Sequence, residues 1–176
     1  DNRLARDVLL ADARRLVADA AGQPWRMAWC AGVGVNGTST ERFAAENALF
    51  AAVLDELGGA AGPGTVFYAS SAGGVYADSS APPFTESSPV APLGNYGTAK
   101  LTAERIVADF VENTESTAIV GRLANLYGPG QNLAKPQGLI SHLCRGYLLS
   151  SPVSIYVSMD TLRDYLYITD AAEMVA

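Results

Sequence analysis

Short runs of β-type residues alternate with helix-type segments along this chain, and that order constrains the fold more than any other feature. The run 64–70 is almost continuously apolar, which is typical of a strand covered on both faces of its sheet. Strands that alternate with helices build a parallel sheet joined by right-handed crossovers. The sequence therefore predicts an α/β fold with a mostly parallel sheet.

The individual elements follow from local patterns. Thr38-Ser39-Thr40-Glu41 reads as a capping box at a helix start, whereas Gly22 and Gly58-Gly59 mark helix ends. We expect helices over 12–21, 39–57, 95–112 and 138–149. We expect strands at 8–10, 27–31, 64–70, 117–120, 153–157 and 165–168. A Pro/Ser-rich loop covers 77–93, and no internal repeat or linker divides the chain.

Composition excludes several classes of function. The formal net charge of −6 over 176 residues argues against a nucleic-acid-binding surface. No apolar run approaches the ~18 residues that cross a bilayer, and we expect no secretory leader. Cys30 and Cys144 lack metal-ligand spacing, so we predict no metal site. We expect both to be reduced core residues, which favours a cytoplasmic protein.

Residues 32–37 spell G-x-G-x-x-G after an apolar run, a pattern typical of the phosphate loop of a dinucleotide-binding fold. Such a loop is normally accompanied by an acidic residue at the end of the next strand, ~20 residues further on. Here the next strand ends in Ala69-Ser70-Ser71, without a carboxylate. We therefore predict that the three glycines are not a phosphate loop.

Tyr96 and Lys100 lie four residues apart in the stretch YGTAK, and on a helix such a pair shares one face. The chain has eight tyrosines and only two lysines, so roughly 0.1 matches to this pattern are expected by chance. An ordinary surface pair on a helix is the alternative interpretation.

A phenol beside an ammonium has a chemical use. Its ordinary pKa is ~10, and lowering that value to about 7 requires roughly 4 kcal/mol. A nearby ammonium supplies ~1 to 3 units, and a positively charged nicotinamide ring could supply the rest. The resulting tyrosinate could take a proton from a substrate hydroxyl while hydride leaves the same carbon. Tyr96 and Lys100 are therefore the candidate catalytic pair.

Six stretches of the chain form a recognisable series: WCAG (29–32), ENA (46–48), SSAGGVY (70–76), YGTAK (96–100), RLANLYGPG (122–130) and RDYLYITD (163–170). In order and spacing they resemble the short-chain dehydrogenase/reductase superfamily, specifically its extended branch of nucleotide-sugar epimerases, dehydratases and reductases. The resemblance implies a Rossmann-like parallel sheet with helices on both faces, plus the start of a small substrate-binding lobe.

The same resemblance implies how the chain is organised. Residues 1–176 would form one incomplete NAD(P)-binding domain, with 127–163 contributing to the substrate lobe. Residues 27–32 match the fourth strand of the family fold, so the glycine-rich first βαβ unit is expected upstream of Asp1. NAD is the expected cofactor, with NADP not excluded because the strand that discriminates them would also lie upstream.

Site residues are carried over from the matching motifs. The resemblance implies that Tyr96 is the catalytic base and acid, and that Lys100 is its electrostatic partner and ribose ligand. The implied cofactor-binding residues are Asp12, Ala31, Gly32, Asn47, Ser70, Tyr96, Lys100, Leu123 and Ala124. Alternatives stay open: Asp12 could instead cap a helix, and Asn47 could be an exposed helix residue.

The third catalytic group is ambiguous. Counting back from Tyr76 places Ala72 where many relatives carry Ser or Thr, whereas counting back from Tyr96 favours Ser71. We assign Ser71 as the third catalytic residue and Ala72, Asn125 and Arg163 to the substrate. Both serines, 70 and 71, could instead simply cap the strand end, and Arg163 could form a salt bridge with Asp160 or Asp164 rather than bind a pyrophosphate.

The resemblance favours NAD(P)-dependent oxidoreduction or epimerisation of a nucleotide-activated sugar, of the UDP-hexose 4-epimerase type. A nucleotide-sugar ketoreductase or dehydrogenase, or a non-catalytic dinucleotide-binding relative, is the alternative. Gly73-Gly74 stands where 4,6-dehydratases usually carry an acid pair, which argues against that reaction. In this family the helices matching 39–57 and 95–112 often form a dimer seam, so we expect a homodimer, with no nucleic-acid or membrane partner.

Overall fold

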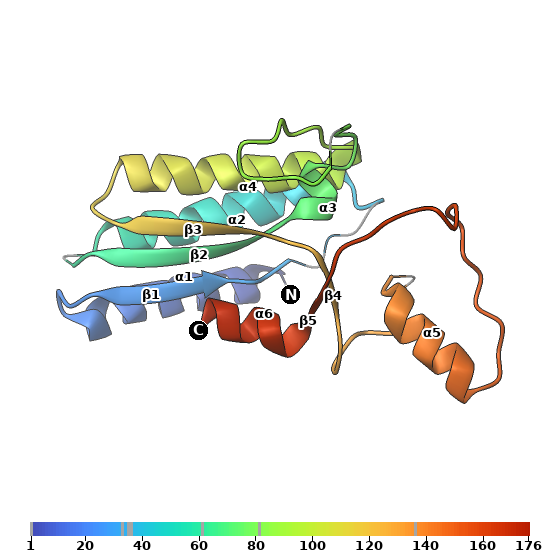
Figure 1. Cartoon of the computed structure of the whole chain (residues 1–176). Coiled ribbons are helices and arrows are strands. Elements are labelled where there is room, and N and C mark those ends of the chain that lie inside the picture. The colour runs from blue at the N-terminus through green and yellow to red at the C-terminus, as the bar shows by residue number, and fades with distance from the viewer. Residues whose placement is uncertain (1, 33, 35–36, 61, 81, 136) are drawn as a thin grey trace. The chain divides into compact units, whose positions relative to one another are not determined.

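The computed structural model in Figure 1 describes residues 2–32, 34, 37–60, 62–80, 82–135 and 137–176. Two compact units divide the chain, Asp1–Arg122 and Leu123–Ala176. None of the described helices combines the length and the hydropathy needed to cross a membrane. These are called unit 1 and unit 2.

Unit 1 carries most of the regular structure. Its elements are α1 (Asn2–Ala20), β1 (Trp25–Trp29), α2 (Thr40–Gly58), β2 (Gly64–Ser71), α3 (Ala72–Val75), α4 (Gly94–Glu112) and most of β3 (Thr117–Leu123). Unit 2 contains β4 (Asn125–Tyr127), α5 (Leu139–Leu148), β5 (Tyr165–Tyr167) and α6 (Ile168–Val175).

A sheet of order β1-β2-β3 forms the centre of unit 1. β1 and β2 run parallel, with Trp25 opposite Gly64 and Trp29 opposite Tyr68. β3 starts beside the start of β2, because the backbone N–H of Gly64 donates to Ser116 Oγ at 3.2 Å. In unit 2, β4 and β5 also pair in parallel. The predicted α/β fold with a parallel sheet and flanking helices is confirmed.

The core of unit 1 lies between the sheet and its helices. Val66 and Tyr68 alternate along β2 on one face of the sheet, and both are buried in a single cluster with residues of α1, α2 and α4. Phe50 of α2 is stacked against Trp29 at 4.8 Å and against Tyr68 at 5.2 Å between ring centroids. Within unit 1 the described helices α1, α2 and α4 thus share this face (Figure 1).

Two predicted strands are wrong. Residues 8–10 belong to α1, which starts at Asn2 rather than at 12, because the half-buried Leu9 and Leu10 join Ala13 on the side of the helix that packs on the core. Residues 153–157 form no strand. Tyr156 in that segment is 94% exposed, and β-type residues do not form a strand without a neighbour to pair with.

Two local predictions need smaller corrections. The helix cap is Ser39 rather than Thr38, since Ser39 Oγ accepts a hydrogen bond from the backbone N–H of Arg42 at 3.3 Å. The two cysteines are exposed rather than buried. Cys30 comes directly after the end of β1 in unit 1, and Cys144 lies on α5 in unit 2.

Replacing one buried leucine tests the packing of this core. Leu57 of α2 is 1% exposed, whereas Leu4 of α1 is 67% exposed. We expect Leu57→Ala to lower the free energy of unfolding by about 2–5 kcal/mol, because the substitution leaves a cavity. Leu4→Ala serves as the matched control and should change it by less than about 0.5 kcal/mol. Chemical denaturation followed by circular dichroism measures both, and equal effects would contradict the assigned core.

Candidate active site

Helix α4 carries the predicted catalytic pair on one side. Lys100 Nζ lies 5.9 Å from the centroid of the Tyr96 ring, as the four-residue spacing on a helix predicts. Both side chains are half-buried. The ring of Tyr96 also lies 6.1 Å from that of Phe43, a buried residue of α2. The pair therefore faces the interior of unit 1 rather than open solvent.

The ammonium of Lys100 is held at the carboxyl end of β2. It donates a hydrogen bond to the carbonyl oxygen of Ala69 at 2.9 Å and lies 5.1 Å from the centroid of the Tyr68 ring. Burial lowers the pKa of Lys100 below its usual value, while the nearby carboxylates of Glu46 and Glu104 oppose this effect. The side chain is thus a partly desolvated cation at the end of a parallel strand.

Two phenols flank this cation, and they differ in their surroundings. Tyr68 is 3% exposed, and burial raises the pKa of its hydroxyl above the usual value. That hydroxyl therefore stays protonated at neutral pH. Tyr96 is less deeply buried and lies on α4 next to the ammonium. Of the two, Tyr96 is the better candidate for proton transfer.

The short helix α3 places Ser71 near this pair. Ser71 is the N-cap of α3, and its Oγ accepts a hydrogen bond from the backbone N–H of Gly74 at 3.2 Å. α3 packs directly on α4, because a Cβ on Gly97 would lie 2.2 Å from the carbonyl oxygen of Gly74. A Cβ on Gly74 would lie 3.0 Å from the Tyr96 ring. Glycine at both positions permits this backbone contact.

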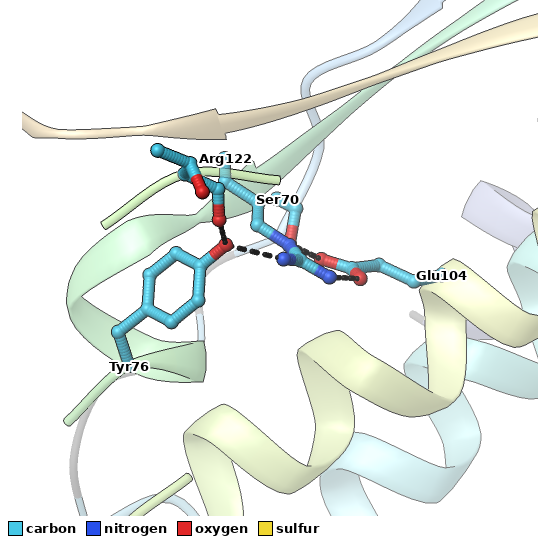
Figure 2. A network of polar contacts seen from close by, with 5 residues as sticks. Ser70, Tyr76, Glu104 and Arg122 are labelled. Atoms are coloured by element: carbon cyan, nitrogen blue, oxygen red, sulfur yellow. Dashed lines mark hydrogen bonds and ion pairs between the residues drawn. The ribbon is translucent and has the colours of Figure 1, made fainter. Parts of the chain in front are cut away.

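Figure 2 shows a partly buried polar network that joins Ser70, Tyr76, Glu104 and Arg122. Its carboxylate, Glu104, lies one helical turn beyond Lys100 on α4. Arg122 of β3 donates to both carboxylate oxygens of Glu104, from Nε at 3.0 Å and from Nη2 at 2.7 Å. Its third nitrogen, Nη1, donates to the Tyr76 hydroxyl at 2.5 Å. Ser70 Oγ donates to Glu104 at 2.5 Å. The carboxylate of Glu104 raises the pKa of Arg122, so the guanidinium stays charged.

Two residues expected to bind the cofactor also have protein partners. The hydroxyl of Ser70 is engaged with Glu104, and the residue is 4% exposed. The side-chain amide of Asn47 donates to the carbonyl oxygen of Ala99 at 3.0 Å. Asn47 is thus half-buried and joins α2 to α4 next to Lys100, rather than being an exposed helix residue.

The glycine pattern at 32–37 lies partly outside the described residues, which omit 33, 35 and 36. Among the described positions, Ala31 and Gly32 are exposed after the end of β1. Gly34 has a packing role, because a Cβ there would lie 2.2 Å from the ring of Phe43. This contact accounts for one of the three glycines without a bound phosphate.

Asp12 does not start a helix, so the alternative that it is an N-cap is wrong. It lies in the middle of α1, and its carboxylate forms an exposed ion pair with Arg15 at 3.1 Å. The misplacement follows from the strand that was expected at 8–10. Because α1 is continuous through that segment, no helix begins at 12.

Ala72, expected at the substrate, is the half-buried first residue of α3 in unit 1, and the other predicted residues belong to unit 2. Leu123 and Ala124 are half-buried where β3 ends. The side-chain amide of Asn125 donates to the carbonyl oxygen of Asp164 at 2.9 Å. Arg163 is exposed and donates to the carbonyl oxygen of Leu162 at 2.8 Å. Within the described part of the chain, no ion pair joins Arg163 to Asp160 or Asp164.

Unit 2 also contains an open, mainly apolar cavity of about 620 Å³. It lies between the loop after β4, the helix α5 and β5. Its lining residues are Tyr127, Gly128, Pro129, Leu133, Ile140, Ser141, Cys144, Arg145, Leu148, Leu149 and Tyr167. Arg145 is the cationic side chain in this lining, and a cavity of this size accommodates a small ligand.

Sequence reasoning missed Glu104, and it assigned no role to Tyr76 or Arg122. A signal for Glu104 was present, because Tyr96, Lys100 and Glu104 recur at four-residue steps and so lie along one side of α4. Tyr76 and Arg122 occur within quoted motifs. Nothing in the sequence shows that their side chains meet, since 46 residues separate them.

The site has features that suit a dinucleotide. Lys100 has three donor protons, and one bond, to Ala69, is described for them. The remaining donors could bind the hydroxyls of a ribose. No carboxylate, imidazole or thiol cluster of metal-binding size occurs among the described residues.

Comparisons with known proteins place the chain in a family. The sequence model of the NAD dependent epimerase/dehydratase family matches residues 14–176. The dTDP-4-dehydro-6-deoxyglucose reductase of Escherichia coli is 32% identical over 108 residues, which are 61% of this chain and 34% of the reductase. The dTDP-glucose 4,6-dehydratase of Neisseria gonorrhoeae is 32% identical over 89 residues, covering 51% of this chain and 25% of that enzyme.

Solved structures show the same relationship. The UDP-glucose 4-epimerase of Thermotoga maritima, solved with UDP-glucose, superposes with a TM-score of 0.77 at 21% identity, over 94% of this chain and 55% of that one. MoeE5, solved with UDP-glucose and NAD, has a TM-score of 0.71 at 28% identity, over 91% and 53%. The chain thus spans about half of these proteins and a third or less of the two curated relatives.

The burial of Lys100 gives a direct prediction about its proton. In the folded protein we expect its amine to lose the proton at a lower pH than in the urea-unfolded chain, where the pKa of lysine is ~10.4, because burial disfavours the charged form. Competitive acetylation over a pH series, with mass spectrometry of the peptide containing residue 100, measures both midpoints. A folded midpoint at or above the unfolded one would contradict the assigned environment.

Proposed function

The chain belongs to the NAD dependent epimerase/dehydratase family, and on this basis we propose that its protein acts on a nucleotide-activated sugar. The proposed reaction is NAD-dependent epimerisation of the UDP-hexose 4-epimerase type. The observation that carries the proposal is the position of Lys100. Its ammonium lies beside Tyr96 and is anchored on the carbonyl oxygen of Ala69, at the carboxyl end of a parallel strand, which is where α/β sheets bind their ligands.

Tyr96 is the proposed base and acid. A positive charge within a few ångströms of a phenol favours the phenolate, and Lys100 provides that charge. The phenolate takes the proton from a ring hydroxyl of the sugar and later returns it to the oxygen. When bound, NAD would supply the hydride chemistry at the carbon that carries this hydroxyl.

Ser71 is the proposed third residue of the site. Its hydroxyl accepts the N–H of Gly74, which leaves its own proton available for the reacting oxygen. Ala72 has no hydroxyl and would instead contribute a small apolar wall on the substrate side. Lys100 binds the nicotinamide ribose through its remaining donors, and Ala31 and Gly32 border the adenosine half.

Unit 2 is the proposed contribution to the substrate lobe, through residues 127–163. Asn125 and Arg163 are the proposed sugar-nucleotide ligands, and a guanidinium suits a pyrophosphate because it can donate two parallel hydrogen bonds. Arg163 is exposed and carries no ion pair with the nearby aspartates, so it has donors to offer. A nucleotide-sugar substrate also favours a cytoplasmic location for the protein.

A one-way ketoreductase or dehydrogenase is the second candidate. The observation that favours it is the E. coli relative, a reductase that is 32% identical over 108 residues. Dehydration is less well supported, because Gly73-Gly74 offers no carboxylate after Ser71 and Ala72. A non-catalytic dinucleotide-binding relative is the third candidate, and turnover by the purified protein rules it out.

Removing the Tyr96 hydroxyl tests the assignment of the base. We expect Tyr96→Phe to lower kcat by about 10²–10⁴-fold while NAD binding and thermal unfolding stay unchanged, since the ring and its packing remain. Turnover of UDP- and dTDP-hexoses is measured by chromatography of the nucleotide sugars. Arg105→Gln, on the exposed side of the same helix, is the control and should leave kcat unchanged. Intact turnover in Tyr96→Phe would refute the assignment.

The net change of the cofactor separates the two leading reactions. An epimerase returns its hydride, so product should form without a lasting change in absorbance at the nicotinamide band. A reductase or dehydrogenase should consume one NAD(P)H or NAD(P)⁺ for each product molecule. Parallel assays with NAD and NADP also identify the preferred cofactor. Stoichiometric consumption would replace the epimerase proposal with the second candidate.

We also propose that the protein is a homodimer that uses the outer sides of α2 and α4. The exposed side of α2 carries small residues, Ala44, Ala45 and Ala48, which allow a second helix to approach closely. We expect Ala48→Arg to shift the protein from dimer to monomer in light scattering at micromolar concentration. The matched control is Ala18→Arg on the exposed side of α1. A monomeric parent protein would contradict this proposal.

A further inference from the structure

We propose that Arg122, Glu104 and Tyr76 are positioning residues that hold α3 against α4 and so fix the Ser71 hydroxyl relative to Tyr96. These three residues are called the Arg122 clamp. The expected effect of the clamp on turnover rests on the proposed function. The hold of the clamp on α3 concerns only the structure of unit 1 and can be tested without substrate.

α3 cannot hold its own position. It has 4 residues, and a single helical turn is not stable in isolation. Its location is therefore set by what binds its two ends and its side. Ser71 caps the start of the helix, and Tyr76 is the C-cap at its end. Ser71, with the candidate catalytic hydroxyl, and Tyr76, with the phenol bound by Arg122, thus flank one helical turn.

The side of α3 touches the catalytic helix backbone to backbone. Gly74 of α3 and Gly97 of α4 approach so closely that neither accepts a Cβ without a shift of its neighbours. The ring of Tyr96 lies directly against Gly74. Because no side chain separates the two helices there, a displacement of α3 would move both the Ser71 hydroxyl and one wall of the Tyr96 site.

The clamp holds the end of α3 with three strong contacts. Arg122 forms a bidentate bond to Glu104 of α4 and, through Nη1, a bond to the Tyr76 hydroxyl (Figure 2). The same hydroxyl donates to the carbonyl oxygen of Thr85 at 2.8 Å. Tyr76 is 7% exposed. One phenol therefore ties α3 to β3, to α4 through Glu104, and to the loop that follows.

A structural ion pair alone does not explain this arrangement. The pair between Arg122 and Glu104 already joins β3 to α4, and Ser70 Oγ adds a bond to the same carboxylate. What Tyr76 adds is the connection to α3, which no charged group of the network provides. Its ring is also stacked on Phe84 at 4.8 Å, so the ring keeps its packing when the hydroxyl is removed.

Tyr76→Phe is the decisive variant, because it removes one oxygen and leaves both charges and the ring in place. Without substrate, we expect the backbone N–H groups of Gly74 and Tyr76 to exchange with solvent deuterium roughly 10-fold faster. Exchange in α2 should not change. In turnover assays we expect kcat to fall by roughly 10- to 100-fold, with little change in KM for NAD and an unchanged pH profile, because the charges beside Tyr96 are retained.

Two further variants complete the test. Arg122→Lys keeps the charge and one bond but loses the two parallel bonds of the guanidinium. Its exchange rate in α3 and its kcat should therefore lie between those of the parent protein and those of Arg122→Gln. Arg14→Gln removes an exposed ion pair of the same type, between Arg14 and Glu56, and should alter neither measurement. A matching loss in Arg14→Gln would mean that the effect is general destabilisation, which overturns the proposal.

The outcomes separate this proposal from the proposed function. Unchanged exchange of α3 in Tyr76→Phe overturns the clamp, whether or not the parent protein turns over a nucleotide sugar. Faster exchange of α3 with an unchanged kcat overturns the role of the clamp in positioning the Ser71 hydroxyl. A parent protein without turnover refutes the proposed function, while faster exchange in Tyr76→Phe still supports the hold of the clamp on α3.

Discussion

The packing of α4 on β2 is the constraint on which the candidate active site depends. The apolar half of this helix is buried, with Ala103 and Val107 each 1% exposed. The polar residues Tyr96, Lys100 and Glu104 follow one another at four-residue steps along the helix. Burial of the apolar half fixes the rotation of the helix, and that rotation carries Lys100 Nζ to the carbonyl oxygen of Ala69. The reactive groups are thus oriented by the hydrophobic core.

The arrangement of charges in unit 1 leaves Lys100 with hydrogen-bond donors for which no partner is described. Glu104 is one turn away from it, but Arg122 and Ser70 occupy the carboxylate. A half-buried carboxylate without these partners would be poorly solvated and would compete for the ammonium. Because the network satisfies Glu104, the ammonium is left with a single described bond to a backbone carbonyl. That division of contacts suits a lysine that is to bind a ligand.

Much of this could be predicted from the sequence. The YGTAK stretch identified the helix that carries Tyr96 and Lys100, and the family motifs predicted the parallel α/β fold, because spacing along a regular element is a local property. The failures are of another kind. Residues 8–10 and 153–157 have strand-like composition, yet the first packs as a helix and the second finds no neighbouring strand. Pairing depends on residues distant in the chain.

The amino-acid sequence by itself determined the type and order of most elements, the family, and the candidate pair on α4, since each is encoded in short-range patterns. Only the tertiary structure decided which polar groups form hydrogen bonds with one another inside the protein. Ser70 and Asn47, both expected at a cofactor, also form hydrogen bonds to Glu104 and Ala99. Tyr76 and Arg122 meet across 46 residues. Hydrogen bonds between elements depend on how those elements pack, and packing is a property of the whole core rather than of any motif.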